Sequence, residues 1–158
     1  RGLIVTGKML EEKKKQLQNI VDVEMPANSK EIGYALSLGD LRENAEYKAA
    51  KERQTILNTT ATRLQEEIER AMVFDPTTVV ISRVSFGTVV TLKNNKENTE
   101  ETYTILGPWE SDPDNFVISY MSPFGNAILN RKVGEELTFT INEREYNYTI
   151  TSITAASI

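Results

Sequence analysis

The sequence predicts an α+β protein of two domains: a long antiparallel α-helical hairpin, then a mostly antiparallel sheet with one short helix. In the first half of the 158-residue chain, apolar residues recur at three- and four-residue spacing, which is typical of paired helices. In the second half, short β-branched and aromatic runs alternate with turn residues. The pattern changes at Asp75-Pro76. We therefore predict one domain over residues 1–74 and another over residues 75–158.

The first predicted helix begins after a plausible N-cap, Thr6, and ends before Gly39, which suits the position just beyond a helix. Its apolar stripe changes phase near Pro26, because proline lacks a backbone donor and bends a helix. The stripe consists of Leu10, Leu17 and Ile20 before the proline and of Met25, Ile32 and Ala35 after it. We expect a helix of roughly 30 residues, about 45 Å long.

The second predicted helix runs from near Glu43 to Met72 and has the stronger periodicity. Positions 47, 50, 54, 57, 61, 64, 68 and 71 follow strict 3/4 spacing, and seven of the eight are apolar or aromatic. This is the pattern of a coiled-coil seam, in which Tyr47 is expected to pack. Two such stripes joined by a tight turn bury each other as an antiparallel pair.

The second half is predicted to form six short strands and one helix. The helix is expected over residues 122–129, after the turn that contains Pro123. Gly, Pro, Asn and Asp clusters separate the strands. The strands are expected at residues 79–81, 88–92, 101–106, 115–120, 136–141 and 146–150.

The composition excludes several kinds of site. The chain has no cysteine and no histidine, so disulfides, thiolate or imidazole metal ligands and histidine-based triads are excluded. No apolar stretch approaches the roughly 20 residues that span a bilayer. Residues 1–72 hold 12 basic and 12 acidic residues, so the net charge of −5 comes from the second half. The second half is thus too acidic for general nucleic-acid adhesion, which needs a concentrated basic face, and only the first half could offer local positive charge.

The turn between the two predicted helices carries two carboxylates, Asp40 and Glu43, beside Gly39. The spacing fits an N-terminal capping box, in which Asp40 accepts backbone N–H groups of the second helix. It also fits an acidic tip that presents negative charge to a partner. A carboxylate engaged in capping has fewer oxygens available for a metal, so the two roles compete in part.

The whole tip segment, residues 39–52 (GDLRENAEYKAAKE), resembles the signature of the bacterial Gre transcript-cleavage factors, closer to the GreA type than to GreB. The resemblance covers nearly the whole chain. It includes Ser122-Pro123 and the segments at residues 85–90, 101–107 and 133–136. The tip motif is long and specific, whereas the strand motifs alone are weak.

The resemblance implies a cytoplasmic elongation factor that binds bacterial RNA polymerase and is not itself an enzyme. The hairpin would enter the secondary channel, and a C-terminal domain of FK506-binding-protein-like fold would dock outside. Inside the channel, the tip would stimulate the polymerase's own Mg²⁺-dependent cleavage of backtracked RNA. Asp40 and Glu43 would be the catalytic carboxylates and would share Mg²⁺ with the polymerase, because the hairpin alone should bind it poorly.

The resemblance also implies two contact surfaces. Lys51, with Lys48 and Arg53, would contact extruded RNA, although a solvated helix face explains these residues equally well. Met121, Ser122, Pro123 and Phe124 would dock on the polymerase, unless they form an ordinary strand-to-helix turn. Two other functions stay open: a channel-binding relative that inhibits the polymerase, and a prolyl isomerase built on the C-terminal fold.

Overall fold

The computed structural model describes residues 2–40 and 44–158. Their contacts form two compact units. The first consists of Gly2 and Leu10–Ala71, and the second of Leu3–Met9 and Met72–Ile158. Contacts within one structure do not show whether the chain divides into independently folding domains after residue 74, so that boundary stays a prediction. None of the helices in the described ranges is long and apolar enough to cross a membrane.

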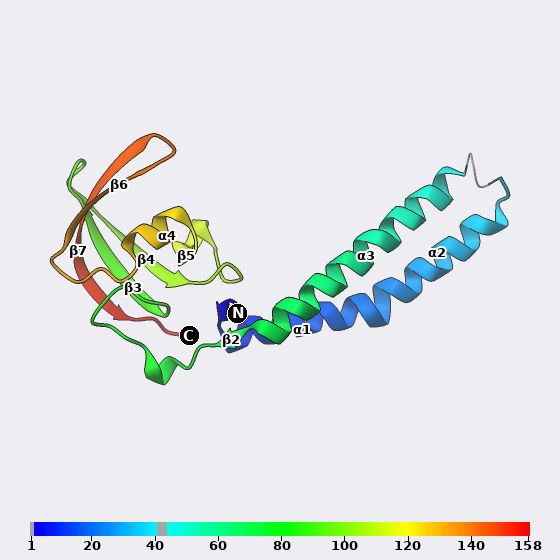
Figure 1. The fold of residues 1–158 in the computed structure, drawn as a ribbon, viewed down its shortest axis with the longest axis horizontal. Coiled ribbons are helices and arrows are strands. Elements are labelled where there is room, and N and C mark those ends of the chain that lie inside the picture. Colours follow the sequence, from blue (N-terminus) through cyan, green and yellow to red (C-terminus); the bar gives the residue numbers. More distant parts are fainter. Residues whose placement is uncertain (1, 41–43) are drawn as a thin grey trace. The chain divides into compact units, whose positions relative to one another are not determined.

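The first unit is built on a helical hairpin (Figure 1). Its first arm comprises α1 (Gly7–Asn19), a π-helical segment (Ile20–Glu24) and α2 (Met25–Ser37), and its second arm is α3 (Ala45–Arg70). The predicted hairpin is therefore confirmed.

The seam between the arms matches the predicted stripes. On α3, Ala50, Leu57, Ala61 and Leu64 are buried, and the other four predicted seam positions are half-buried, Tyr47 among them. Ile20, from the first arm, completes the buried cluster. Burying each large aliphatic side chain contributes about 1.5–3 kcal/mol, so the seam holds the two arms together.

The phase change in the first arm is a turn of π-helix. The backbone N–H of Met25 donates to the carbonyl oxygen of Ile20, five residues earlier, which inserts one extra residue into the helix. The seam accordingly steps by five residues from Ile20 to Met25. Pro26 lies in the first turn of α2, where its missing N–H costs little. The predicted change is confirmed, and the π-turn carries it.

The second unit holds a five-stranded mixed sheet with one short helix, α4 (Pro123–Ile128) (Figure 1). The strand order is β5-β4-β3-β7-β6; β4 and β5 pair in parallel and the other neighbours pair antiparallel. The predicted mostly antiparallel sheet with one small helix is confirmed. The strands are β3 (Thr88–Asn94), β4 (Thr99–Leu106), β5 (Val117–Ser119), β6 (Glu136–Ile141) and β7 (Arg144–Ala155).

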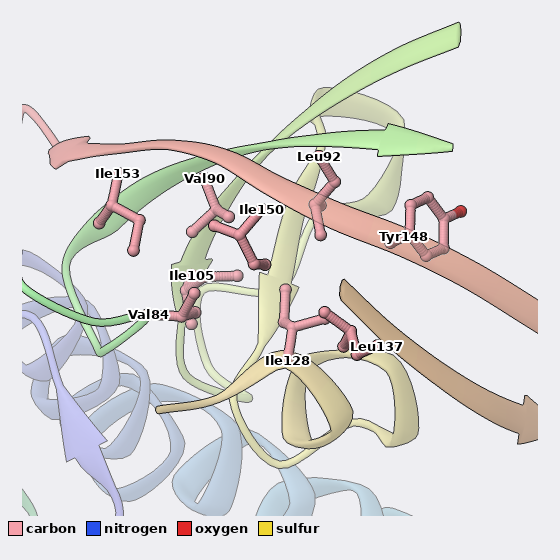
Figure 2. Packing of buried hydrophobic residues seen from close by; sticks show 9 residues of the cluster. All are labelled: Val84, Val90, Leu92, Ile105, Ile128, Leu137, Tyr148, Ile150 and Ile153. Atoms are coloured by element: carbon pink, nitrogen blue, oxygen red, sulfur yellow. The ribbon is translucent and has the colours of Figure 1, made fainter. Parts of the chain in front are cut away.

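The core of this unit lies between one face of the sheet and α4. In Figure 2, side chains from β3, β4 and β7 point toward Ile128 of α4 and Leu137 of β6. Ile128, Ile150, Leu92 and Ile105 are fully buried. Along β3, buried residues alternate with more exposed ones. A sheet that is covered on one face requires such an alternation.

One predicted strand was wrong. Residues 79–81 form no strand; they follow a 3₁₀ turn at Pro76–Thr78, and Val80 and Ile81 are exposed. The β-branched run favours extended backbone, but these residues pair with no strand in the part of the chain that the structure describes.

Two strands were not predicted. β1 (Ile4–Val5) and β2 (Met72–Val73) form a parallel pair. A parallel pairing between two-residue strands this far apart in sequence leaves no periodic signal.

Side-chain hydrogen bonds bind the N-terminal segment to the rest of the second unit. The Tyr120 hydroxyl accepts the Ile4 N–H at 3.0 Å, and Glu110 Oε2 accepts the Thr6 N–H at 2.9 Å and its hydroxyl at 3.2 Å. Thr6 Oγ1 in turn accepts the Met9 N–H at 3.2 Å, which confirms Thr6 as the N-cap of α1. A Cβ at Gly107 would lie 2.7 Å from the Ile4 carbonyl oxygen, so this close approach requires glycine.

Candidate functional site at the hairpin tip

The first arm ends in the predicted way. The N–H of Leu38 donates to the Ala35 carbonyl at 3.1 Å and closes the last turn of α2. Gly39 then adopts a φ of 109°, a left-handed conformation that favours glycine. The chain thus leaves the helix axis directly before the exposed Asp40.

The second arm begins later than predicted, at Ala45, and its N-cap is Asn44. Asn44 Oδ1 accepts the Tyr47 N–H at 3.0 Å. Capping of the second helix, one of the two roles that the spacing allows for Asp40, therefore falls to Asn44 in α3. Asn and Asp are about equally good N-caps, so residue type alone does not distinguish them. Glu43, the other predicted tip carboxylate, lies outside the described residues.

A shallow hollow of about 360 Å³ lies at the tip, lined by Leu38, Asp40, Asn44, Ala45 and Glu46. It brings Asp40 together with a carboxylate that was not predicted, Glu46 in the first turn of α3. Glu46 could have been identified from the sequence, because an acidic residue is favourable in the first turn of a helix and this one lies only six residues after Asp40. Carboxylate oxygens are the ligands that Mg²⁺ prefers. Within residues 2–40 and 44–158, no group of three or more Asp, Glu, His or Cys side chains could hold a metal ion.

The three predicted RNA-binding residues do not share one face. At 100° per residue, Lys48 and Lys51 lie about 60° apart around α3, whereas Arg53 lies about 140° from Lys48. Arg53 Nε instead approaches Glu31 Oε1 of α2 at 3.8 Å. Lys51 Nζ donates to Gln54 Oε1 at 2.8 Å. The exposed pair Lys48 and Lys51 forms one basic position beside the tip.

The four predicted docking residues surround the start of α4 in the second unit. Ser122 is the N-cap: its Oγ accepts the Gly125 N–H at 3.1 Å and donates to the Ser119 carbonyl at 2.7 Å. Met121 is 59% exposed and Pro123 is also exposed.

The fourth docking candidate, Phe124, packs into the unit. Its ring lies 5.2 Å from that of Tyr103 and 5.5 Å from that of Phe139, measured between centroids. Met121 and Pro123 are thus available for contact, whereas Phe124 supports the surface from behind.

Both halves of the chain match known families. Residues 3–73 match the family described as "Transcription elongation factor, N-terminal", and residues 79–155 match "Transcription elongation factor, GreA/GreB, C-term".

Three relatives are each named transcription elongation factor GreA. The protein of Treponema pallidum (strain Nichols) is 67% identical over 158 residues, which cover 100% of this chain and 98% of that protein. The Thermodesulfovibrio yellowstonii protein is 36% identical over 94% of each chain. The Borreliella burgdorferi protein is 45% identical over 96% of this chain but only 17% of its own length. By these matches over both of its halves, the chain belongs to the GreA/GreB family of transcription elongation factors.

Proposed function

We propose that this chain acts on bacterial RNA polymerase as an elongation factor that stimulates cleavage of backtracked RNA. In this proposal the hairpin enters the secondary channel and its tip reaches the polymerase's active site. The family and the relatives named transcription elongation factor GreA support an action on transcription. The tip motif supports the cleavage step.

The observation that carries the proposal is an exposed carboxylate, Asp40, at the end of a long helical hairpin. The second arm, α3, has 26 residues, so it extends about 39 Å at 1.5 Å per residue. A narrow two-helix projection of this length can enter a channel that a globular domain cannot. Because Asn44 caps α3, the Asp40 carboxylate is not needed as the N-cap of that helix.

The chemistry requires oxygen ligands. Bound Mg²⁺ would stabilise the leaving oxygen and help to generate the attacking hydroxide. Asp40 and Glu43 would supply carboxylate oxygens to an ion shared with the polymerase, which fits the preference of Mg²⁺ for such ligands. The hairpin would thus complete a nucleolytic site that belongs to the polymerase, and the chain would act as an accessory factor.

The remaining contacts divide between the two units. Lys48 and Lys51, on one face of α3, would contact phosphates of the extruded RNA. Met121 and Pro123, exposed at the start of α4, would dock on the polymerase, with Ser122 holding the turn. Arg53 is the weakest of these candidates, because Glu31 lies beside its guanidinium.

The test is RNA cleavage in a purified, deliberately backtracked polymerase complex, with and without the protein. We expect Mg²⁺-dependent acceleration that Asp40→Asn or Glu43→Gln lowers at least about tenfold, roughly 1.4 kcal/mol of barrier. Glu66→Gln, an exposed carboxylate further along α3, is the matched control and should leave the rate unchanged. Full activity in both tip variants, or cleavage of RNA by the protein without polymerase, would refute the proposal.

A further inference from the structure

Asn44 joins the ends of the two hairpin arms. Besides capping α3 through Oδ1, it donates from Nδ2 to the carbonyl oxygen of Ala35 in α2, at 2.6 Å. The same carbonyl accepts the Leu38 N–H that ends α2. One half-buried amide therefore bridges the last turn of one arm and the first turn of the other.

This bridge closes the loop that carries Asp40. Residues 35 and 44 are held together through a side chain, and Asp40 lies between them in sequence. Asp40 and Asn44 also line the same hollow. A loop closed at its base has fewer conformations, so less entropy is lost when one of its side chains is held in a fixed place.

Only an amide of this length suits both bonds. The N-cap bond needs an acceptor, which Ser, Thr and Asp also provide. The bond to Ala35 needs a donor on the same side chain, which Asp lacks and which Ser is too short to place there. Asn44 therefore does more than begin a helix.

We propose that Asn44 is a positioning residue. By linking α3 to α2 across the tip, it holds Asp40 in the arrangement that transcript cleavage requires. This inference rests on the proposed function, because it concerns the same carboxylate. Catalysis is sensitive to the position of such a carboxylate, since a displacement of a catalytic group by about 1 Å can lower the rate about a hundredfold.

The chain supplies a matched comparison in Asn28. This residue is 2% exposed, and its Nδ2 donates to the Ala50 carbonyl at 2.9 Å, so it also links α2 to α3 through an amide–carbonyl bond. It lies in the middle of the hairpin rather than at the tip. Asn28→Ser thus removes the same kind of bond without touching the loop that carries Asp40.

The first experiment measures cleavage in backtracked complexes at saturating protein. For Asn44→Ser we expect at least a fivefold lower rate, a protein concentration for half-maximal effect within twofold of wild type, and at least a threefold higher Mg²⁺ requirement. Asn44→Asp, which keeps the cap, should behave in the same direction, and Asn28→Ser should stay within twofold of wild type in rate. An unchanged rate in Asn44→Ser, an equal loss in Asn28→Ser, or a loss that appears only as weaker binding would overturn the proposal.

The second experiment needs no polymerase. The ¹⁵N relaxation of the Asp40 amide should show a lower order parameter in Asn44→Ser and an unchanged one in Asn28→Ser. An unchanged Asp40 amide in Asn44→Ser would overturn the positioning role even if cleavage fell. If Asp40→Asn cleaves at the wild-type rate, the proposed function fails, and the relaxation result still decides whether Asn44 orders the tip.

Discussion

At the scale of single residues, Glu101 is the polar centre of the second unit. Its carboxylate accepts the hydroxyl of Tyr103 at 2.6 Å and that of Tyr148 at 3.0 Å, and Asn94 Nδ2 at 3.2 Å. Burial, followed by the hydrogen bond to this carboxylate, raises the pKa of both tyrosines above the ordinary value. Both tyrosines belong to the packing of the sheet core: Tyr148 lies in the buried cluster and Tyr103 packs against it.

The raised tyrosine pKa values predict a loss of stability in alkali. The fold favours the protonated phenols, so their contribution is complete below the unfolded pKa of about 10 and is lost as the pH rises from there toward the folded values. The unfolding free energy, measured by denaturant titration between pH 8 and 11, should fall above pH ~10. Tyr148→Phe should make that fall shallower. A slope equal to that of wild type would show that Tyr148 does not contribute.

The tip residues differ in how well the sequence predicts their roles. The sequence identified Asp40, because an exposed carboxylate beside a helix-ending glycine is recognisable. It did not identify Asn44 as the cap, because Asp and Asn are about equal N-caps and the length of a loop cannot be read from residue types. The bond from Asn44 to Ala35 depends on how the two arms meet, which no local pattern records.

At the scale of elements, the turn between β6 and β7 contains an unfavourable residue. Asn142 and Glu143 have φ values of 50° and 68°, as a two-residue type I′ turn requires. Asn tolerates this conformation, whereas Glu incurs a steric cost of about 1–2 kcal/mol there.

Glu143→Gly should therefore stabilise the protein. Relief of the steric cost exceeds the entropy that glycine adds to the unfolded chain, and the net gain should be about 0.5–1 kcal/mol in unfolding free energy. Glu97→Gly, in a turn where φ is not positive, is the control and should destabilise. Chemical denaturation of both variants decides the matter, and a loss of stability in Glu143→Gly would contradict the strain argument.

The elements that the sequence predicted best are those with long periodic patterns. The α3 seam was predicted closely because its period repeats several times. Strand β6 was predicted closely because it lies between clear turn signals. The π-turn was predicted only as a change of phase, since apolar spacing shows that a residue is added but not which hydrogen bonds add it. Residues 79–81 were misassigned because propensity does not supply a partner strand.

At the scale of the whole molecule, chain order and spatial order differ. Leu3–Met9 belongs to the same unit as Met72–Ile158, through pairing of β1 with β2 and through Glu110 and Tyr120. The residue pattern changes from helical to extended at Asp75-Pro76, which indicates a boundary there. The long-range bonds that connect the N-terminal segment to the sheet have no sequence signal.

Glu110 should be essential to that connection. It accepts two bonds from Thr6 and one from the Gly107 N–H at 3.0 Å, and Glu110→Gln places an amide donor where an acceptor is needed. We expect a loss of about 1–3 kcal/mol and faster hydrogen exchange of the Thr6 amide. Asp114→Asn, an exposed site in the same loop, should change neither. Unchanged exchange at Thr6 in Glu110→Gln would show that β1 pairing alone holds the segment.

In the proposed function, binding to the polymerase and assistance to cleavage are separate, and the tip carboxylates would supply the second. The most direct measurement is competition: Asp40→Asn protein is titrated against a fixed amount of wild-type protein on backtracked complexes. We expect cleavage to fall to the low rate that Asp40→Asn alone supports, at least about tenfold below that of wild type, with half of the fall where the two proteins occupy equal shares of polymerase. Failure of the variant to compete, or stimulation by the variant as strong as that of the wild type, would show that binding and assistance to cleavage are not separated at Asp40.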